Sequence, residues 1–183
     1  MELKYDLYRI KGKNDIWTLI QTFFSNRTFR FIVYYRLERK YCKNIFLFSL
    51  LRFFSHLLNR KMSIEIPTNV QIGRGLLLLH PHAITINSKA VIGDNFTIMK
   101  GATIGNIKGG KRNGTPIIGD NVYVGLNSTI VGNVTIGNNV LIAANTFVNF
   151  DVPDGAMVIG SPGIIHPGHG SENYIVNSIK DFK

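Results

Sequence analysis

Residues 117–148 read "IIGDNVYVGLNSTIVGNVTIGNNVLIAANTFV", and an aliphatic residue returns at every sixth position of this stretch. The period slips by two residues between Ile84 and Ile92 and by eight between Ile104 and Ile118, which predicts a loop inserted at each of these places. The aliphatic positions that keep the period are Ile66, Ile72, Leu78, Ile84, Ile92, Ile98, Ile104, Ile118, Val124, Ile130, Ile136, Ile142 and Val148.

A second period accompanies the first, three residues after each aliphatic position. Asn, Gly and Asp dominate there, and these residues tolerate left-handed backbone angles. Short strands with a tight corner every six residues predict a triangular solenoid. A β-sandwich would instead show turn signals at irregular spacing and hairpin dipeptides. The corner positions are Asn69, Gly75, Pro81, Asn87, Asn95, Gly101, Asn121, Asn127, Asn133, Asn139, Asn145 and Asp151.

Three of the units, "IGDNFT" (92–97), "IGDNVY" (118–123) and "IGNNVL" (136–141), resemble those of the hexapeptide-repeat acyltransferases. That resemblance covers about residues 62–165 and implies a left-handed parallel β-helix, although crossovers are generally right-handed. We therefore expect a mainly β protein with a helical region at 1–62, a β-helix catalytic domain at 63–165 that carries a loop at 105–116, and a C-terminal tail at 166–183.

The N-terminal region has apolar residues spaced three and four apart, as amphipathic helices do. It also carries 13 Lys and Arg against 4 Asp and Glu, which accounts for most of the net charge of +10. Basic and aromatic residues together are typical of contact with a membrane surface or nucleic acid, or of a small helical domain with a solvated basic rim. We expect no nucleic-acid partner, and we keep peripheral membrane contact through residues 1–62 as an alternative.

The sequence favours a cytoplasmic protein, at most peripheral at the inner face of the membrane. No apolar run approaches the roughly 18 residues that a membrane span needs, and the N-terminal residues are too polar for a signal peptide. The single cysteine, Cys42, excludes an intrachain disulfide.

Few polar residues interrupt the aliphatic pattern, and these are the candidates for chemistry. They are His80, His82 and Glu65, with the loop "GNIKGGKRNGTP" (105–116). The stretch "IEIPTNVQIGRGLLLLHPHAITIN" (64–87) resembles the serine O-acetyltransferase branch, most closely its members that acetylate exopolysaccharide and capsule sugars. The resemblance implies that His80 is the general base and that Glu65, where the family usually has Asp, orients it.

These residue types suit acetyl transfer to an alcohol. A hydroxyl is a poor nucleophile near neutral pH and needs a base whose pKa lies close by, which imidazole provides. A carboxylate on the other ring nitrogen fixes the tautomer and stabilises the imidazolium. Because only two histidines lie on the repeats, we expect no metal.

The resemblance also assigns the remaining site residues. Acetyl-CoA, the co-substrate, is expected in the groove between neighbouring β-helices of a homotrimer. Its predicted contacts are Gly105, Gly125, Leu126, Ala143 and Ala144. The residues predicted to bind the acceptor are His82, Asn87, Lys108, Lys111 and Arg112.

Two departures from the serine O-acetyltransferase pattern bear on the acceptor. Leu79 and Thr115 stand where that branch usually carries Asp and His to engage the amino acid, and "PGII" (162–165) replaces the usual closing motif with its cation. We therefore predict an acceptor hydroxyl on a bacterial polysaccharide or its lipid-linked precursor. The alternatives are a serine or other small-molecule O-acetyltransferase and a non-catalytic solenoid scaffold.

Overall fold

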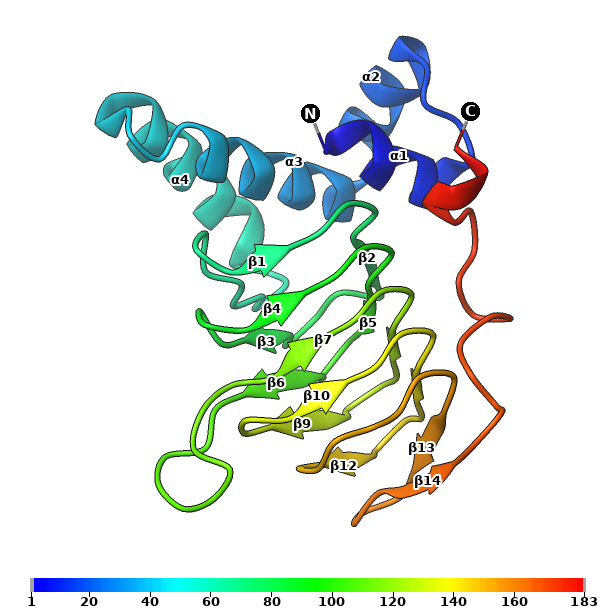
Figure 1. Cartoon of the computed structure of the whole chain (residues 1–183). Coiled ribbons are helices and arrows are strands. Elements are labelled where there is room, and N and C mark those ends of the chain that lie inside the picture. The colour runs from blue at the N-terminus through cyan, green and yellow to red at the C-terminus, as the bar shows by residue number, and fades with distance from the viewer. Residues whose placement is uncertain (1, 183) are drawn as a thin grey trace.

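The computed structural model describes residues 2–182, in which four helices precede a coil of short parallel strands (Figure 1). Side-chain caps define the start of three of the helices, because the carboxylate or amide oxygens of Asp15, Asn26 and Asn44 accept hydrogen bonds from backbone N–H groups of the first turn. The helices are α1 (Leu3–Lys11), α2 (Ile16–Ser25), α3 (Arg27–Lys40) and α4 (Ile45–Asn59).

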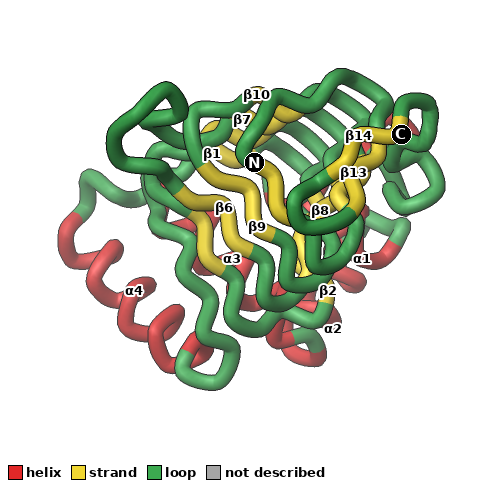
Figure 2. Tube along the Cα trace, turned by 90° about the horizontal axis from the view of Figure 1, so that it is seen from below, coloured by secondary structure: helices red, strands yellow, loops and turns green. Residues whose placement is uncertain are grey.

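From Gln71 to Val148, successive strands take one of three sheets in turn. The last two strands both join the second sheet, and their pairing is the antiparallel one among the described strand pairs. The first sheet holds β1 (Gln71–Ile72), β4 (Val91–Ile92), β7 (Ile117–Ile118) and β10 (Thr135–Ile136). The second holds β2 (Leu77–Leu79), β5 (Thr97–Met99), β8 (Tyr123–Val124), β11 (Leu141–Ile142), β13 (Met157–Ile159) and the antiparallel β14 (Ile164–His166). The third holds β3 (Thr85–Ile86), β6 (Thr103–Gly105), β9 (Thr129–Val131) and β12 (Phe147–Val148). Figure 2 shows the coils stacked on one another, with the helices beyond them.

The aliphatic hexad residues fill the interior of the coil, as the period predicts. Ile98, Ile104 and Ile130 are fully buried and belong to one continuous apolar core. Neighbouring coils approach closely at the glycine after the aliphatic residue, since a Cβ on Gly119 would lie 3.0 Å from the backbone of Gly137. The solenoid is therefore a packed core rather than a hollow tube.

The structure corrects the position of the first slip in the repeat. Ile86 pairs with Ile104, and both side chains point inward. The two additional residues therefore lie between Leu78 and Ile86, at the corner that contains His80, and not between Ile84 and Ile92. The sequence is ambiguous here because Ile84 is buried as well. The second slip is where the sequence predicts it, between β6 and β7.

The left-handed backbone that we expected at every corner occurs at only part of the predicted positions. Asn69, Pro81, Asn87, Asn133 and Asp151 are not among the residues with positive φ. Pro81 lies in the enlarged corner between the second and third sheets. The other four lie at corners that follow the third sheet, where Gly132 has the positive φ in place of Asn133. Positive φ occurs at Gly75, Gly101, Asn95, Asn121, Asn127, Asn139 and Asn145, which occupy the other two corners.

Buried charged residues join the helices to the first coil. Arg36 pairs with Asp6 at 2.9 Å and donates to the carbonyl oxygens of Ile72 and Gly73, while Asp6 accepts from the N–H of Leu76. Burial raises the pKa of Asp6, although Arg36 acts in the opposite direction. Burial by itself would lower the pKa of Arg36, but its contacts with Asp6 and Glu2 outweigh this and raise it. The N-terminal charge is therefore partly internal and not only a solvated rim.

The C-terminal segment runs back along the coil to the helices (Figure 1). The Ser171 hydroxyl donates to the carbonyl oxygen of Asn121, and the N–H of Ile179 donates to the side chain of Asn95 at 3.0 Å. Phe182 then packs on Tyr5, with ring centroids 4.5 Å apart. The tail thus covers one asparagine corner and ends against α1.

Candidate active site

The histidine corner, residues 80–84 between β2 and β3, departs from the regular corners of the coil. Leu79 and Thr85 lie six positions apart, whereas their partners on the next coil, Met99 and Thr103, lie four apart. His80 and Ala83 both adopt left-handed φ values, 49° and 52°. Such angles in residues other than glycine store strain and are often found at functional sites. The insertion thus presents exposed side chains on an otherwise minimal turn.

Both histidines of this corner are exposed. His82 is free of the packing of the repeat because it lies within the two-residue insertion. The corner is still tied to its neighbours through the backbone: the carbonyl oxygen of His82 accepts from the N–H of Gly101 at 2.8 Å. The backbone is fixed while the imidazoles stay accessible.

Glu65 lies directly beside the histidine corner. Its N–H donates to the carbonyl oxygen of Ile84 at 2.7 Å, and its own carbonyl oxygen accepts from the N–H of Ile86 at 2.8 Å. Within residues 2–182, the structure records no side-chain hydrogen bond for Glu65, His80 or His82. The fold thus brings Glu65 next to the corner, and the pairing of its carboxylate with His80 stays a prediction.

The two side chains line different pockets. His80 lines a pocket of about 300 Å³ with Leu79, Arg9 of α1 and Asn177 of the tail. Burial lowers the pKa of Arg9 to about 10, which leaves it cationic at neutral pH. Its Nη2 donates to the Thr97 hydroxyl at 2.7 Å. The sequence does not predict that Arg9 and Asn177 line this pocket, because nothing in the hexad pattern indicates which helix or tail residues reach the corner.

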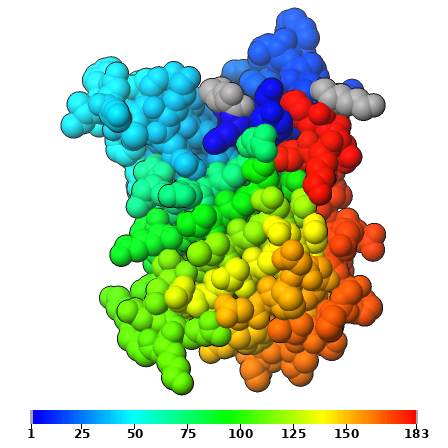
Figure 3. Space-filling model, in the orientation of Figure 1, coloured from blue at the N-terminus to red at the C-terminus, as the bar shows by residue number. Residues whose placement is uncertain are grey.

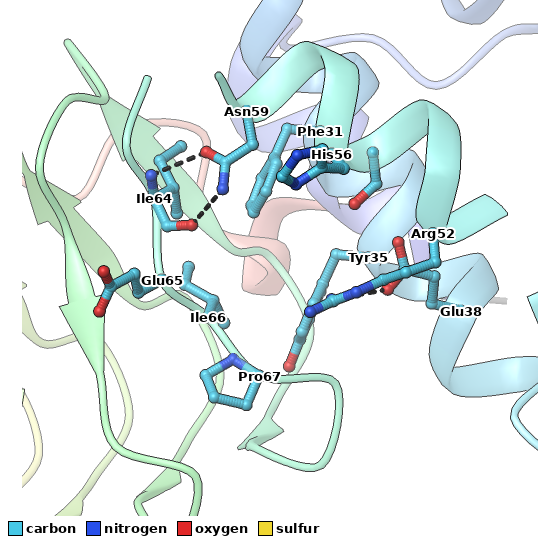
Figure 4. Close-up of a pocket in the computed structure, with 11 residues that line it drawn as sticks. Phe31, Tyr35, Glu38, Arg52, His56, Asn59, Ile64, Glu65, Ile66 and Pro67 are labelled. Atoms are coloured by element: carbon cyan, nitrogen blue, oxygen red, sulfur yellow. Dashed lines mark hydrogen bonds and ion pairs between the residues drawn. The ribbon is translucent and has the colours of Figure 1, made fainter. Parts of the chain in front are cut away.

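Glu65 lines a second pocket, of about 250 Å³, between α3, α4 and the start of the coil. Figure 4 shows its carboxylate pointing away from the ion pair of Arg52 and Glu38. Burial raises the pKa of Tyr35, whose hydroxyl donates to the carbonyl oxygen of Val70 at 2.9 Å. This pocket is therefore walled by the helical region on one side and by the repeat on the other.

Four of the five predicted acetyl-CoA contacts stack beneath the histidine corner. Gly125 and Leu126 form the equivalent corner two coils on, and Ala143 and Ala144 the one after that. Gly125 has a structural reason to be small, since a Cβ there would lie 2.7 Å from the N of Ala144. Leu126 and Ala143 are half-buried and Ala144 is exposed. This column of corners therefore presents a surface of small and apolar residues beside the N-terminal ends of the strands of the third sheet.

Gly105 does not join that column. It is the last residue of β6, so it lies at the C-terminal ends of the strands of the third sheet, where the loop at 105–116 begins. The histidine corner lies at their N-terminal ends. Between these two ends the outward-facing residues of the sheet are Glu65, Thr85, Thr103, Thr129 and Phe147. The third sheet therefore has the histidines at the N-terminal ends of its strands and the loop at the C-terminal ends.

The loop is held by several residues that the sequence assigned to the acceptor. Arg112 pairs with Asp151 at 3.0 Å and donates to the carbonyl oxygen of Asn133. The side-chain amide of Asn87 donates to Asn106 at 3.2 Å, which fixes the base of the loop. By contrast, Lys108 and Lys111 are exposed near its tip. Asn87 and Arg112 thus have structural roles, and the two lysines remain available to a ligand.

Residues 115–149 match the family model described as bacterial transferase hexapeptide (six repeats). The serine acetyltransferase of Staphylococcus xylosus is 43% identical over 104 residues, which are 56% of this chain and 47% of that protein. The chain is therefore similar to the hexapeptide-repeat transferases over residues 115–149 and to the serine acetyltransferases over a longer segment. It spans about half the length of this curated relative.

Solved structures agree with the fold of this chain. The serine acetyltransferase of Neisseria gonorrhoeae in complex with serine has a TM-score of 0.73 at 28% identity, covering 90% of this chain and 67% of that one. A serine acetyltransferase in complex with CoA has a TM-score of 0.70 at 24% identity, covering 90% and 68%. The likeness confirms the predicted left-handed parallel β-helix preceded by a helical region.

Proposed function

We propose that the protein is an acetyl-CoA-dependent O-acetyltransferase whose general base is His80. One observation carries the proposal: a coil corner enlarged by two residues presents an exposed histidine, in a chain similar to serine acetyltransferases. A scaffold would not need such a corner. The CoA complex of a structural neighbour supports acetyl-CoA as the donor.

In this mechanism His80 removes the proton of the acceptor hydroxyl as its oxygen attacks the thioester carbonyl. The carbon–sulfur bond then breaks, and the imidazolium returns the proton to the departing thiolate, which leaves an ester and free CoA. General-base assistance of this kind contributes about 10²–10⁴-fold in rate. Glu65 would orient the ring and stabilise its cation. The corner column at Gly125, Leu126, Ala143 and Ala144 is the proposed wall for the donor.

Serine is the acceptor that the comparisons favour. The named relatives are serine acetyltransferases, and one neighbour is a complex with serine. None of the relatives named above is described as modifying a polysaccharide, so these comparisons do not support the predicted sugar acceptor.

A sugar hydroxyl remains a second candidate because of two residues. Leu79 is half-buried and apolar beside His80, and the Thr115 hydroxyl is occupied by a hydrogen bond to the carbonyl oxygen of Lys89 at 3.1 Å. Neither residue provides a charge for an ammonium or carboxylate group. A neutral acceptor avoids leaving such charged groups without partners.

Thiol release from acetyl-CoA tests both acceptors. Purified protein is assayed with serine and with a panel of neutral sugars, and the esters are identified by mass spectrometry. Turnover on the order of 10 per second with serine supports the serine acceptor. Turnover only with a sugar supports the second candidate. Absence of acetyl transfer to every acceptor contradicts the proposed activity.

We also propose a homotrimer, since a single triangular coil leaves its outer walls without partners. Light scattering at micromolar concentration should give three times the mass of one chain. A monomer would contradict both the trimer and a donor groove shared between chains.

A further inference from the structure

Two of the helices, α2 and α4, turn large apolar side chains outward, away from the rest of the molecule. Trp17 is 77% exposed, Phe46 79% and Ile45 82%. Figure 3 shows the helical residues projecting beyond the coils as two lobes. We define the apolar helical face as Ile16, Trp17, Ile20 and Phe24 of α2 with Ile45, Phe46, Leu50, Phe53, Phe54 and Leu57 of α4.

The two halves of this face are continuous. A row of aromatic rings crosses from α2 over α3 to α4, with Tyr34 at its centre. The centroids of Phe23 and Tyr34 lie 6.3 Å apart, and those of Tyr34 and Phe54 lie 6.2 Å apart in a stacked arrangement. Phe24 and Phe53 extend the row at its ends. Contiguous exposed apolar surface of this kind marks an interaction site.

The charge around the face is mainly positive. Of the acidic residues of the helical region, Asp6 and Glu38 are buried and Glu2 pairs with Arg36, which leaves Asp15, the cap of α2, as an exposed carboxylate beside the face. Basic side chains are exposed beside both ends of both helices: Lys13 and Arg27 beside α2, and Lys40, Lys43, Arg60 and Lys61 beside α4. An apolar face within a basic rim complements an anionic lipid surface.

We infer that the apolar helical face binds the surface of an anionic membrane. No helix among residues 2–182 is long and apolar enough to cross a bilayer. The 15 residues of α4 reach roughly 22 Å, less than the hydrocarbon thickness of about 30 Å, so the helix would lie in the interface. A second copy of the chain fits less well, because its basic rim would face this one.

Vesicle sedimentation tests this inference with the full chain. Wild-type protein should bind vesicles of phosphatidylglycerol and phosphatidylcholine, bind pure phosphatidylcholine weakly, and dissociate in high salt. The double variant Trp17→Ser, Phe46→Ser should bind the anionic vesicles more weakly than the wild type, by a factor of about ten or more. The control Ile117→Ser, Ile164→Ser removes comparably exposed side chains from the β-helix, 50% and 63% exposed, and should bind as the wild type does.

Several results would overturn the inference. These are no binding to anionic vesicles, equal binding by both double variants, or a larger solution mass that depends on Trp17 and Phe46, which would assign the face to a second copy. Thermal unfolding should show that the variants are folded. Acetyl transfer in solution should be unchanged by the helical variant, so the membrane site and the proposed activity fail independently.

Discussion

The histidine corner differs from the corner that lies below it on every following coil. Both connect the second sheet to the third, and both are joined by backbone hydrogen bonds. The following corners turn at Gly101, Asn127 and Asn145, which suit a left-handed backbone, whereas the first turns at His80 and Ala83. The regular corners are built for stacking, and the first carries strain together with two accessible imidazoles. The departure from the regular repeat is therefore what marks this corner as the proposed active site.

The largest expected effect separates His80 from its counterpart on the next coil, Lys100. His80→Asn should lower acetyl transfer by about 10²–10⁴-fold, because the base is lost while asparagine tolerates the left-handed backbone. Lys100→Asn should leave the rate near that of the wild type. Acetyl-transfer rates, with thermal unfolding to confirm the fold, make the comparison. Full activity in folded His80→Asn protein would exclude His80 as the base.

The next effect concerns the carboxylate beside the corner. Glu65→Gln should reduce the rate by less than the removal of His80, up to about 10²-fold, because the ring stays in place while the imidazolium loses its partner. His82→Ala should cost less activity than either. The control Glu172→Gln changes an exposed acid of the tail. If Glu65→Gln and Glu172→Gln have the same rate, Glu65 does not assist His80.

A stability measurement addresses the regular corners. Asn127→Ala should lower the free energy of unfolding by about 1 kcal/mol, because alanine tolerates φ of 54° less well than asparagine. The variant also removes the hydrogen bond from Asn127 to Asn145. Urea unfolding gives the difference. An unchanged midpoint would show that these corners are not selected for their backbone angle.

The smallest expected effect is a change in stability at the histidine corner, measured by the same urea unfolding. Ala83→Gly should raise the free energy of unfolding by at most about 1 kcal/mol, since glycine relieves the left-handed strain but orders at a greater entropic cost. Activity should change little, because Ala83 is not proposed to contact the reacting groups. Destabilisation by this variant would mean that the corner is not strained at Ala83.

Several features could be predicted from the sequence because they depend on local spacing. The hexad of Ile118 to Ile142 dictates a buried position once per strand, and the long interval before Ile118 dictates a loop. The exposed place of His80 at a corner follows as well, since it interrupts an apolar run, and its role as the base stays a prediction. Such features need no knowledge of which segments meet in space.

Other features were decided only by the tertiary structure. The sequence offers Ile84 and Ile86 equally as the inward residue, and only pairing with Ile104 selects Ile86 and enlarges the histidine corner. Arg36 resembles a surface cation until Asp6 and the carbonyl oxygens of the first coil surround it. Likewise, a helix with apolar residues at the right spacing predicts a buried face, yet in α4 much of that face is exposed. Burial depends on what a segment packs against, and one-dimensional spacing does not contain that information.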